Sequence, residues 1–193
     1  MPLPAKLLKR LQNAKPTVGI SSCLWGNRVR YDGTDQTEPT IIEHFSEIVQ
    51  WVALCPEVEI GLGVPRPRID LFLKEGQLEL RQDKTDRNLT QAMEDYSFKK
   101  GKELFARHRI SGFLFKTKSP SCALTDGKYK MPGDRETVLQ RGPGLFTKTI
   151  LHIASKRSAM ELPTLDEIGF RDPILRDTFF EKIVLYHDHY DTT

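Results

Sequence analysis

The chain has 193 residues, of which 38% are hydrophobic, 9% aromatic and 28% charged, and its formal net charge is +3. This composition excludes wholesale disorder, and the length suffices for one domain with a substantial core. The mild charge does not by itself indicate a nucleic-acid-binding protein, and no segment approaches the roughly 18 consecutive apolar residues that a membrane span requires.

The first 15 residues predict a short amphipathic helix, with Leu3, Leu7, Leu8 and Leu11 on one face and basic residues on the other. Packing on the domain surface is the simpler interpretation of this helix, and a membrane or RNA contact is the alternative. Because the segment has no cleavable apolar core, we expect a cytoplasmic protein without a secretion signal.

Two strands with a helix between them are predicted next. The run 17–21 predicts a strand that ends at Ser22 and Cys23, and the polar, glycine-terminated segment 27–33 predicts a loop. Apolar residues at helical spacing predict a helix from Thr37 or Thr40 to about Gln50. The run 51–54 predicts a second buried strand, which ends at Cys55.

Glycine and proline recur throughout the segment 58–68, which also contains Arg66 and Arg68. Such a loop is stiff and lets the backbone approach a ligand closely. The two arginines suit a phosphate or carboxylate beside Cys55, or they pair with surface acids. A β-hairpin is predicted at 69–73 and 77–80, with the turn at Gly76.

The remaining chain predicts a helix over 86–108, a strand over 111–116 that leads to Cys122, and helices over 145–154 and from Asp172 to about His189. The segment 125–144 predicts a long surface excursion, suited to a lid or a substrate contact. Strand–helix–strand alternation predicts an α/β fold: a three-layer, Rossmann-like, mostly parallel sheet with helices on both faces, a β-hairpin and a C-terminal helical extension. We assign 1–160 to the α/β domain and 161–193 to its extension.

The three cysteines, Cys23, Cys55 and Cys122, each follow a predicted strand. Parallel strands end at one edge of a sheet, so three sulfurs would lie round one point. An odd cysteine count argues against a disulfide framework, and no C-x-x-C pair is present. The five histidines fall in or next to predicted helices, which favours three protein ligands and one open position on iron–sulfur, copper or zinc. A three-thiolate zinc site completed by a histidine stays open, and simple burial is the alternative for any one cysteine.

Three segments together closely resemble the 2-thiouracil desulfidase family: 22–33, the Cys55-Pro56-Glu57 motif with the loop after it, and 116–122. The resemblance covers roughly residues 16–155. It implies a [4Fe-4S] cluster held by Cys23, Cys55 and Cys122, with one iron free of protein, and the removal of sulfur as hydrosulfide without redox turnover. The implied substrate is a thiolated pyrimidine: free thiouracil, a thiouridine nucleotide or a thiolated tRNA.

The resemblance also implies roles for single residues. It places Glu57 as the group that activates water and moves protons. From their chemistry, Ser119 and Ser121 can supply hydroxyls to the developing charge, and Lys116 or Lys118 a cation nearby. The structural alternatives are that Glu57 caps a turn and that the serines form hydrogen bonds with backbone groups beside Pro120. Substrate contacts are expected from Arg66, Arg30, Asp32, Lys116 and Lys118, although Arg30 and Asp32 suit loop organisation as well. Position 123 is alanine, where the family often has glycine.

A second hypothesis, of a different class, is a non-catalytic RNA-binding module in which the cysteines hold a structural metal. The sequence does not predict an oligomeric state.

Overall fold

A four-stranded parallel sheet forms the centre of the computed structural model, which describes residues 3–191. The strands lie in the order β2-β1-β5-β8. Their bounds are β1 Thr17–Ser21, β2 Gln50–Leu54, β5 Ile110–Phe115 and β8 Thr164–Asp166. Each neighbouring pair is parallel, so all four carboxyl ends lie at the same edge. The chain moves outward from β1 first to one side and then to the other, and ligands bind at such a switch point.

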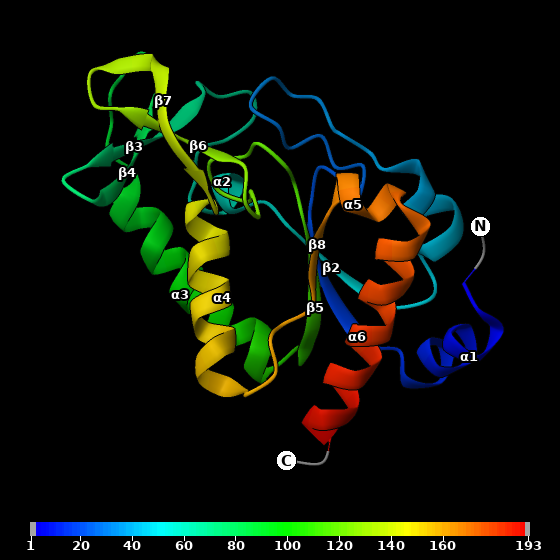
Figure 1. Ribbon diagram of the computed structural model, residues 1–193. Coiled ribbons are helices and arrows are strands. Elements are labelled where there is room, and N and C mark those ends of the chain that lie inside the picture. The colour runs from blue at the N-terminus through cyan, green and yellow to red at the C-terminus, as the bar shows by residue number, and fades with distance from the viewer. Residues whose placement is uncertain (1–2, 192–193) are drawn as a thin grey trace.

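Helices cover both faces of this sheet (Figure 1). One face carries α3 (Thr90–Ala106) and α4 (Leu145–Arg157), and the other carries α1 (Ala5–Ala14), the π-helical turn η1 (Ile41–Phe45) and α6 (Pro173–Asp191). Along β5, Phe113 and Phe115 pack on the face covered by α3 and α4, and Leu114 packs on the face covered by α1, η1 and α6. Burial on both faces is typical of parallel sheets, and it confirms the predicted three-layer α/β fold.

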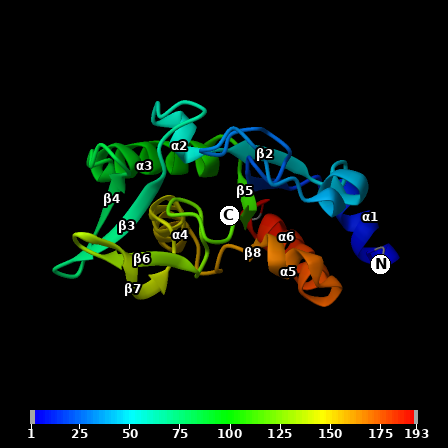
Figure 2. The same ribbon diagram turned by 90° about the horizontal axis from the view of Figure 1, so that it is seen from above.

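A second sheet lies beyond α3 and α4, at one end of the molecule (Figure 2). Its order is β4-β3-β6-β7, with bounds β3 Ile69–Lys74, β4 Gln77–Gln82, β6 Gly127–Met131 and β7 Asp134–Gly142. The predicted hairpin is confirmed as β3 and β4. The segment 125–144, predicted as a long surface excursion, contains β6 and β7, which form a hairpin that pairs with β3. In the middle of β6, Tyr129 is buried and the lysines on either side of it are not. This alternation of buried and exposed residues is too short to predict a strand.

The helix predicted up to Gln50 is much shorter in the structure. Asp35 accepts hydrogen bonds from the backbone N–H and hydroxyl of Thr37, so Thr37 closes a turn and does not cap a helix. The helical segment η1 ends at Phe45, and the N–H of Gln50 already donates to Pro16 at the start of β2. The predicted first helix is observed as α1, and its expected beginning at Met1 and Pro2 lies outside the described residues.

The C-terminal segment is joined to the central sheet. Strand β8 pairs with β5, the short helix α5 (Glu167–Arg171) follows it, and α6 packs against β5. The carboxylate of Asp172 accepts the N–H groups of Ile174 and Leu175, as expected of a residue that caps the last helix. Over residues 3–191, none of the helices combines the length and apolar character that crossing a membrane would need.

Candidate active site

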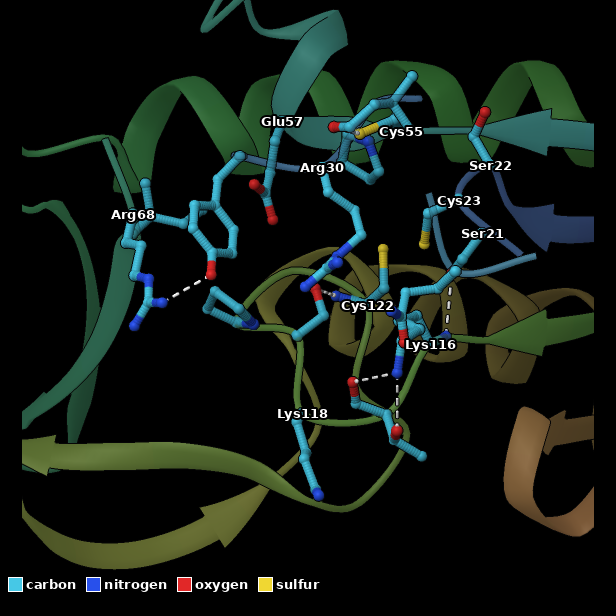
Figure 3. Close-up of a pocket in the computed structure, with 18 of the residues that line it drawn as sticks. Ser21, Ser22, Cys23, Arg30, Cys55, Glu57, Arg68, Lys116, Lys118 and Cys122 are labelled. Carbon is cyan, nitrogen blue, oxygen red and sulfur yellow. Dashed lines mark hydrogen bonds between the residues drawn. The ribbon is translucent and has the colours of Figure 1, made fainter. Parts of the chain in front are cut away.

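A cavity of about 700 Å³ opens at the carboxyl edge of the central sheet, and all three cysteines line it. Cys23 lies in the turn after β1, Cys55 follows β2 directly, and Cys122 lies in the loop after β5. Figure 3 shows their sulfur atoms turned toward one space, with Glu57 beside it. The structure therefore brings together three thiols that lie far apart in the sequence, at the edge where the strand pattern places them.

Local hydrogen bonds position two of these cysteines. Cys55 is the residue before the one-turn helix α2 (Pro56–Glu59), and its carbonyl accepts the N–H of Glu59 at 3.0 Å. Cys122 is held by Ser119, whose hydroxyl accepts the N–H groups of Ser121 at 3.2 Å and Cys122 at 3.0 Å. Ser119 thus folds the Cys122 turn, as the backbone-satisfying alternative for this serine describes.

The amino end of α4 anchors the same turn, the Cys122 loop (119–123). Gly144, Leu145 and Thr147 donate their N–H groups to the carbonyls of Ala123, Pro120 and Ser121, at 2.8, 3.0 and 3.2 Å. The first N–H groups of a helix have no partner within it, so this loop satisfies three of them. Gly144 permits the close approach: a Cβ built there would lie 2.3 Å from the Ser121 carbonyl carbon.

Burial raises the pKa of all three thiols. The pKa of Cys23 rises to about 12, and the pKa values of Cys55 and Cys122 are also raised, with neighbouring thiolate and carboxylate charge adding to the effect of burial. The thiols thus interact with one another electrostatically. A bound group that neutralises thiolate charge would favour their deprotonation.

The donor set indicates which group fits. Within residues 3–191, no three His, Cys, Asp or Glu side chains converge closely enough to share one metal ion. A [4Fe-4S] cluster takes each thiolate on a different iron, so its ligands surround a volume and do not meet at a point. Three thiols round one cavity fit that group.

Glu57 lies next to the thiols in a buried charge network. Its Oε2 accepts hydrogen bonds from Arg66 Nε at 3.1 Å and Nη2 at 2.7 Å, and its Oε1 accepts the Ser121 hydroxyl at 3.1 Å. The Arg66 side chain is only 2% exposed and also lies 4.0 Å from the sulfur of Cys55. Arg66, predicted to contact substrate, is thus committed to orienting Glu57, and Ser121 is fully buried behind the carboxylate.

Other predicted substrate contacts are spread round the cavity. Arg30 lines it and donates to the Thr34 hydroxyl, whereas Asp32 accepts from Thr34 and is not part of the cavity wall. Lys116 and Lys118 both line the cavity. The Lys118 side chain is exposed and forms no ion pair with any residue that the structure describes.

Arg68, expected beside Cys55 together with Arg66, lines the cavity, stacks over the ring of Tyr31 at 4.6 Å and donates to its hydroxyl. The structure also adds cavity residues that the sequence pattern did not single out. They come from the second sheet and from α5: Asp70, Lys128, Lys130, Glu167, Ile168 and Arg171. Glu167 accepts a short hydrogen bond from the ammonium group of Lys116. The signal that could have found it is its position just after a strand end, the same signal that singled out the cysteines.

Comparison with known proteins gives two matches. The profile of the 2-thiouracil desulfurase family matches residues 18–160. The solved structure of TudS, a [4Fe-4S]-dependent thiouracil desulfidase, is similar with a TM-score of 0.62 and 25% sequence identity, over 85% of this chain and 99% of the TudS chain. A search of curated proteins finds no match.

Proposed function

Because the chain belongs to the 2-thiouracil desulfurase family, we propose that it removes sulfur from thiolated pyrimidines at a [4Fe-4S] cluster bound by Cys23, Cys55 and Cys122. The chain is an enzyme, a thiouracil desulfidase. The observation that carries the proposed site is the cavity that three strand-end thiols line together with Glu57. The cluster dependence named for TudS supports the choice of cofactor.

The proposed reaction exchanges the substrate's sulfur for the oxygen of water. When bound by Cys23, Cys55 and Cys122, the cluster would supply a thiophilic Lewis acid for the sulfur that leaves as hydrosulfide. Glu57 takes a proton from the attacking water as the C–O bond forms and gives it to the sulfur as the C–S bond breaks, and the second proton of the water is released to solvent when the ring carbon regains its planar form. Arg66 and Ser121 hold both carboxylate oxygens, which keeps Glu57 in one orientation. No electrons are gained or lost overall.

The charge of the cavity favours a thiouridine nucleotide over the free base. Lys118 and Lys128 line the cavity, are exposed, and form no ion pair within residues 3–191. A neutral pyrimidine needs no such cations, whereas a phosphate binds them through charge-assisted hydrogen bonds. The cavity volume, about 700 Å³, lies within the range of about 300–1,000 Å³ that small-molecule sites occupy. Free thiouracil and thiolated tRNA are the comparison substrates.

The test is anaerobic purification and reconstitution, followed by assays of iron and of sulfide release. We expect a brown protein with about four irons per chain that releases sulfide from 2-thiouracil and from 4-thiouridine 5′-phosphate. Cys122→Ser should lose both colour and turnover. Glu57→Gln should keep the colour and lose turnover, because an amide cannot accept the proton of water.

Two results would overturn these assignments. A colourless protein with stoichiometric zinc would exclude the cluster and favour a structural metal. Full activity of Glu57→Gln would exclude Glu57 as the acid–base group.

A further inference from the structure

Helix α5 connects two of the loops that bear cysteines. Its first residue, Glu167, pairs with Lys116, which begins the segment leading to Cys122. Its last residue, Arg171, donates at 2.8 Å to Glu38, a buried residue whose N–H bonds to Leu24 beside Cys23. The two charged residues lie four positions apart, so they project from one face of the helix. This helix lies beyond residue 160, where the family match ends.

The Glu167 carboxylate is held in one place by several donors. Its side chain is only 6% exposed. Oε2 accepts the N–H of Thr117 at 2.8 Å, and Oε1 accepts the Thr117 hydroxyl at 2.5 Å and the ammonium of Lys116. Burial alone would raise the pKa of Glu167, but the hydrogen bonds from Lys116 and Thr117 outweigh it and hold the pKa below the ordinary value. The group is therefore a carboxylate at neutral pH.

Lys116 is fixed to an extent unusual for a lysine. Its N–H donates to the Ser21 hydroxyl at 3.0 Å, which ties the backbone to the end of β1. Its ammonium donates to Glu167 and to the carbonyl and hydroxyl of Thr117, at 3.2 and 3.0 Å for the latter two. An ammonium has three hydrogens, so each has an acceptor. A flexible four-carbon side chain thus becomes a stationary positive charge.

This charge lies at the wall of the cavity that holds the thiols. Cys23 and Cys122 line the same cavity. The sulfur leaving a thiopyrimidine accumulates negative charge in the same cavity. A cation that is already in place stabilises such charge without rearranging during the reaction.

We propose that Glu167 is a positioning residue for desulfurisation: it fixes the Lys116 ammonium at the wall of the cavity that the thiols line, where the charge stabilises the departing sulfur. This inference rests on the proposed function. It makes the C-terminal segment a part of the active site, although that segment lies outside the matched family region.

The test is a double-mutant cycle with Glu167→Gln, Lys116→Met and the combined variant. For each protein we would measure kcat and KM for sulfide release from 2-thiouracil, and iron per chain. Each single variant should lower kcat by about tenfold or more with KM nearly unchanged, because the interaction is made in the transition state. The combined variant should lose no more than Lys116→Met alone, since Glu167 acts through Lys116. Iron per chain should equal that of the unmodified protein in all three.

Glu79→Gln is the matched control, because Glu79 forms an ion pair with Arg81 at 2.8 Å in the second sheet, outside the cavity. It should keep the unmodified kcat. Should Glu167→Gln fold poorly, Glu167→Asp keeps the negative charge but is one methylene too short to hold both Thr117 and Lys116, and the same loss of kcat is expected.

The outcomes separate the two proposals. An unmodified protein that binds iron but releases no sulfide would overturn the proposed function. With an active unmodified protein, an unchanged kcat in both Glu167 variants, losses that multiply in the combined variant, or a loss explained by lower iron content would each overturn the positioning role.

Discussion

Replacing Gly144 with alanine should loosen the Cys122 loop and impair cluster binding. Gly144 has φ −62° and ψ 161°, a conformation that any residue adopts, so the backbone itself is not strained by alanine. The obstacle is contact: the new Cβ would lie 2.3 Å from the carbonyl carbon of Ser121, 2.4 Å from its oxygen and 2.7 Å from the nitrogen of Cys122. All three are backbone atoms, so no side chain can rotate out of the way.

The size of the effect follows from these distances. Ordinary contact begins at 3.4 Å, so the loop and α4 must separate by about 1 Å. Such a shift takes the three hydrogen bonds between α4 and the loop, now 2.8 to 3.2 Å long, beyond useful length. At about 0.5–1.5 kcal/mol for each of the three bonds, the expected loss is about 1.5–4.5 kcal/mol in the free energy of unfolding. Cys122 moves with its loop, so iron binding should weaken as well.

The assay is urea unfolding of the cluster-free chain, together with iron per chain after anaerobic reconstitution. Gly76→Ala serves as the control, because Gly76 has φ +79° with nothing within 4 Å of a built Cβ. It should lose about 1 kcal/mol from backbone strain and keep its full iron content. A Gly144→Ala variant with unmodified urea midpoint and iron content would refute the reasoning.

Three further predictions concern substrate charge, pH and the core. Changing both Lys118 and Lys128 to Met should raise KM for 4-thiouridine 5′-phosphate by about tenfold and leave KM for 2-thiouracil unchanged in steady-state assays, because only the phosphate uses these charges. The folded-state pKa of Glu167 lies below its ordinary value of 4.5, so its stabilising effect is complete above pH 4.5 and is lost as pH falls through the folded-state pKa. The urea midpoints of the unmodified protein and Glu167→Gln should therefore differ most at pH 7 and converge in acid, and a gap that stays constant with pH would contradict this. Phe113→Ala should lower the free energy of unfolding in urea by about 3–5 kcal/mol, since its ring is 1% exposed and stacks on Phe115 at 4.2 Å; a loss below about 1 kcal/mol would contradict it.

The cavity with its three thiols could be predicted because it depends on strand ends alone. Each cysteine follows an apolar run, and parallel strands place their carboxyl ends at one edge whatever lies between them. The segment before Glu167 was not predicted to be a strand, so Glu167 was not placed at a strand end. That strand has only three residues and follows a proline, so local pattern does not distinguish it from a loop. Glu167 was missed for that reason.

Partners of charged side chains could not be predicted from spacing. The position of Arg66 beside Cys55 was expected, and the structure places its guanidinium 4.0 Å from that sulfur. Its hydrogen bonds to Glu57 depend on how the loop after α2 folds back, and the local sequence pattern does not predict that fold. The pairing of the 127–142 hairpin with β3 is also a long-range contact. It places Lys128 and Lys130 in the wall of the cavity.

The separation of the three cysteines along the chain has a consequence for the life of the protein in a cell. Thiols from three distant loops meet only when the central sheet is assembled, so an unfolded chain cannot offer the same ligand set. A cofactor that binds only the folded state adds about 1.4 kcal/mol of stability for each tenfold excess over its dissociation constant. We therefore expect the cluster-free chain to be cleaved faster in limited proteolysis than the loaded one. Iron supply would then set the abundance of this enzyme as well as its activity.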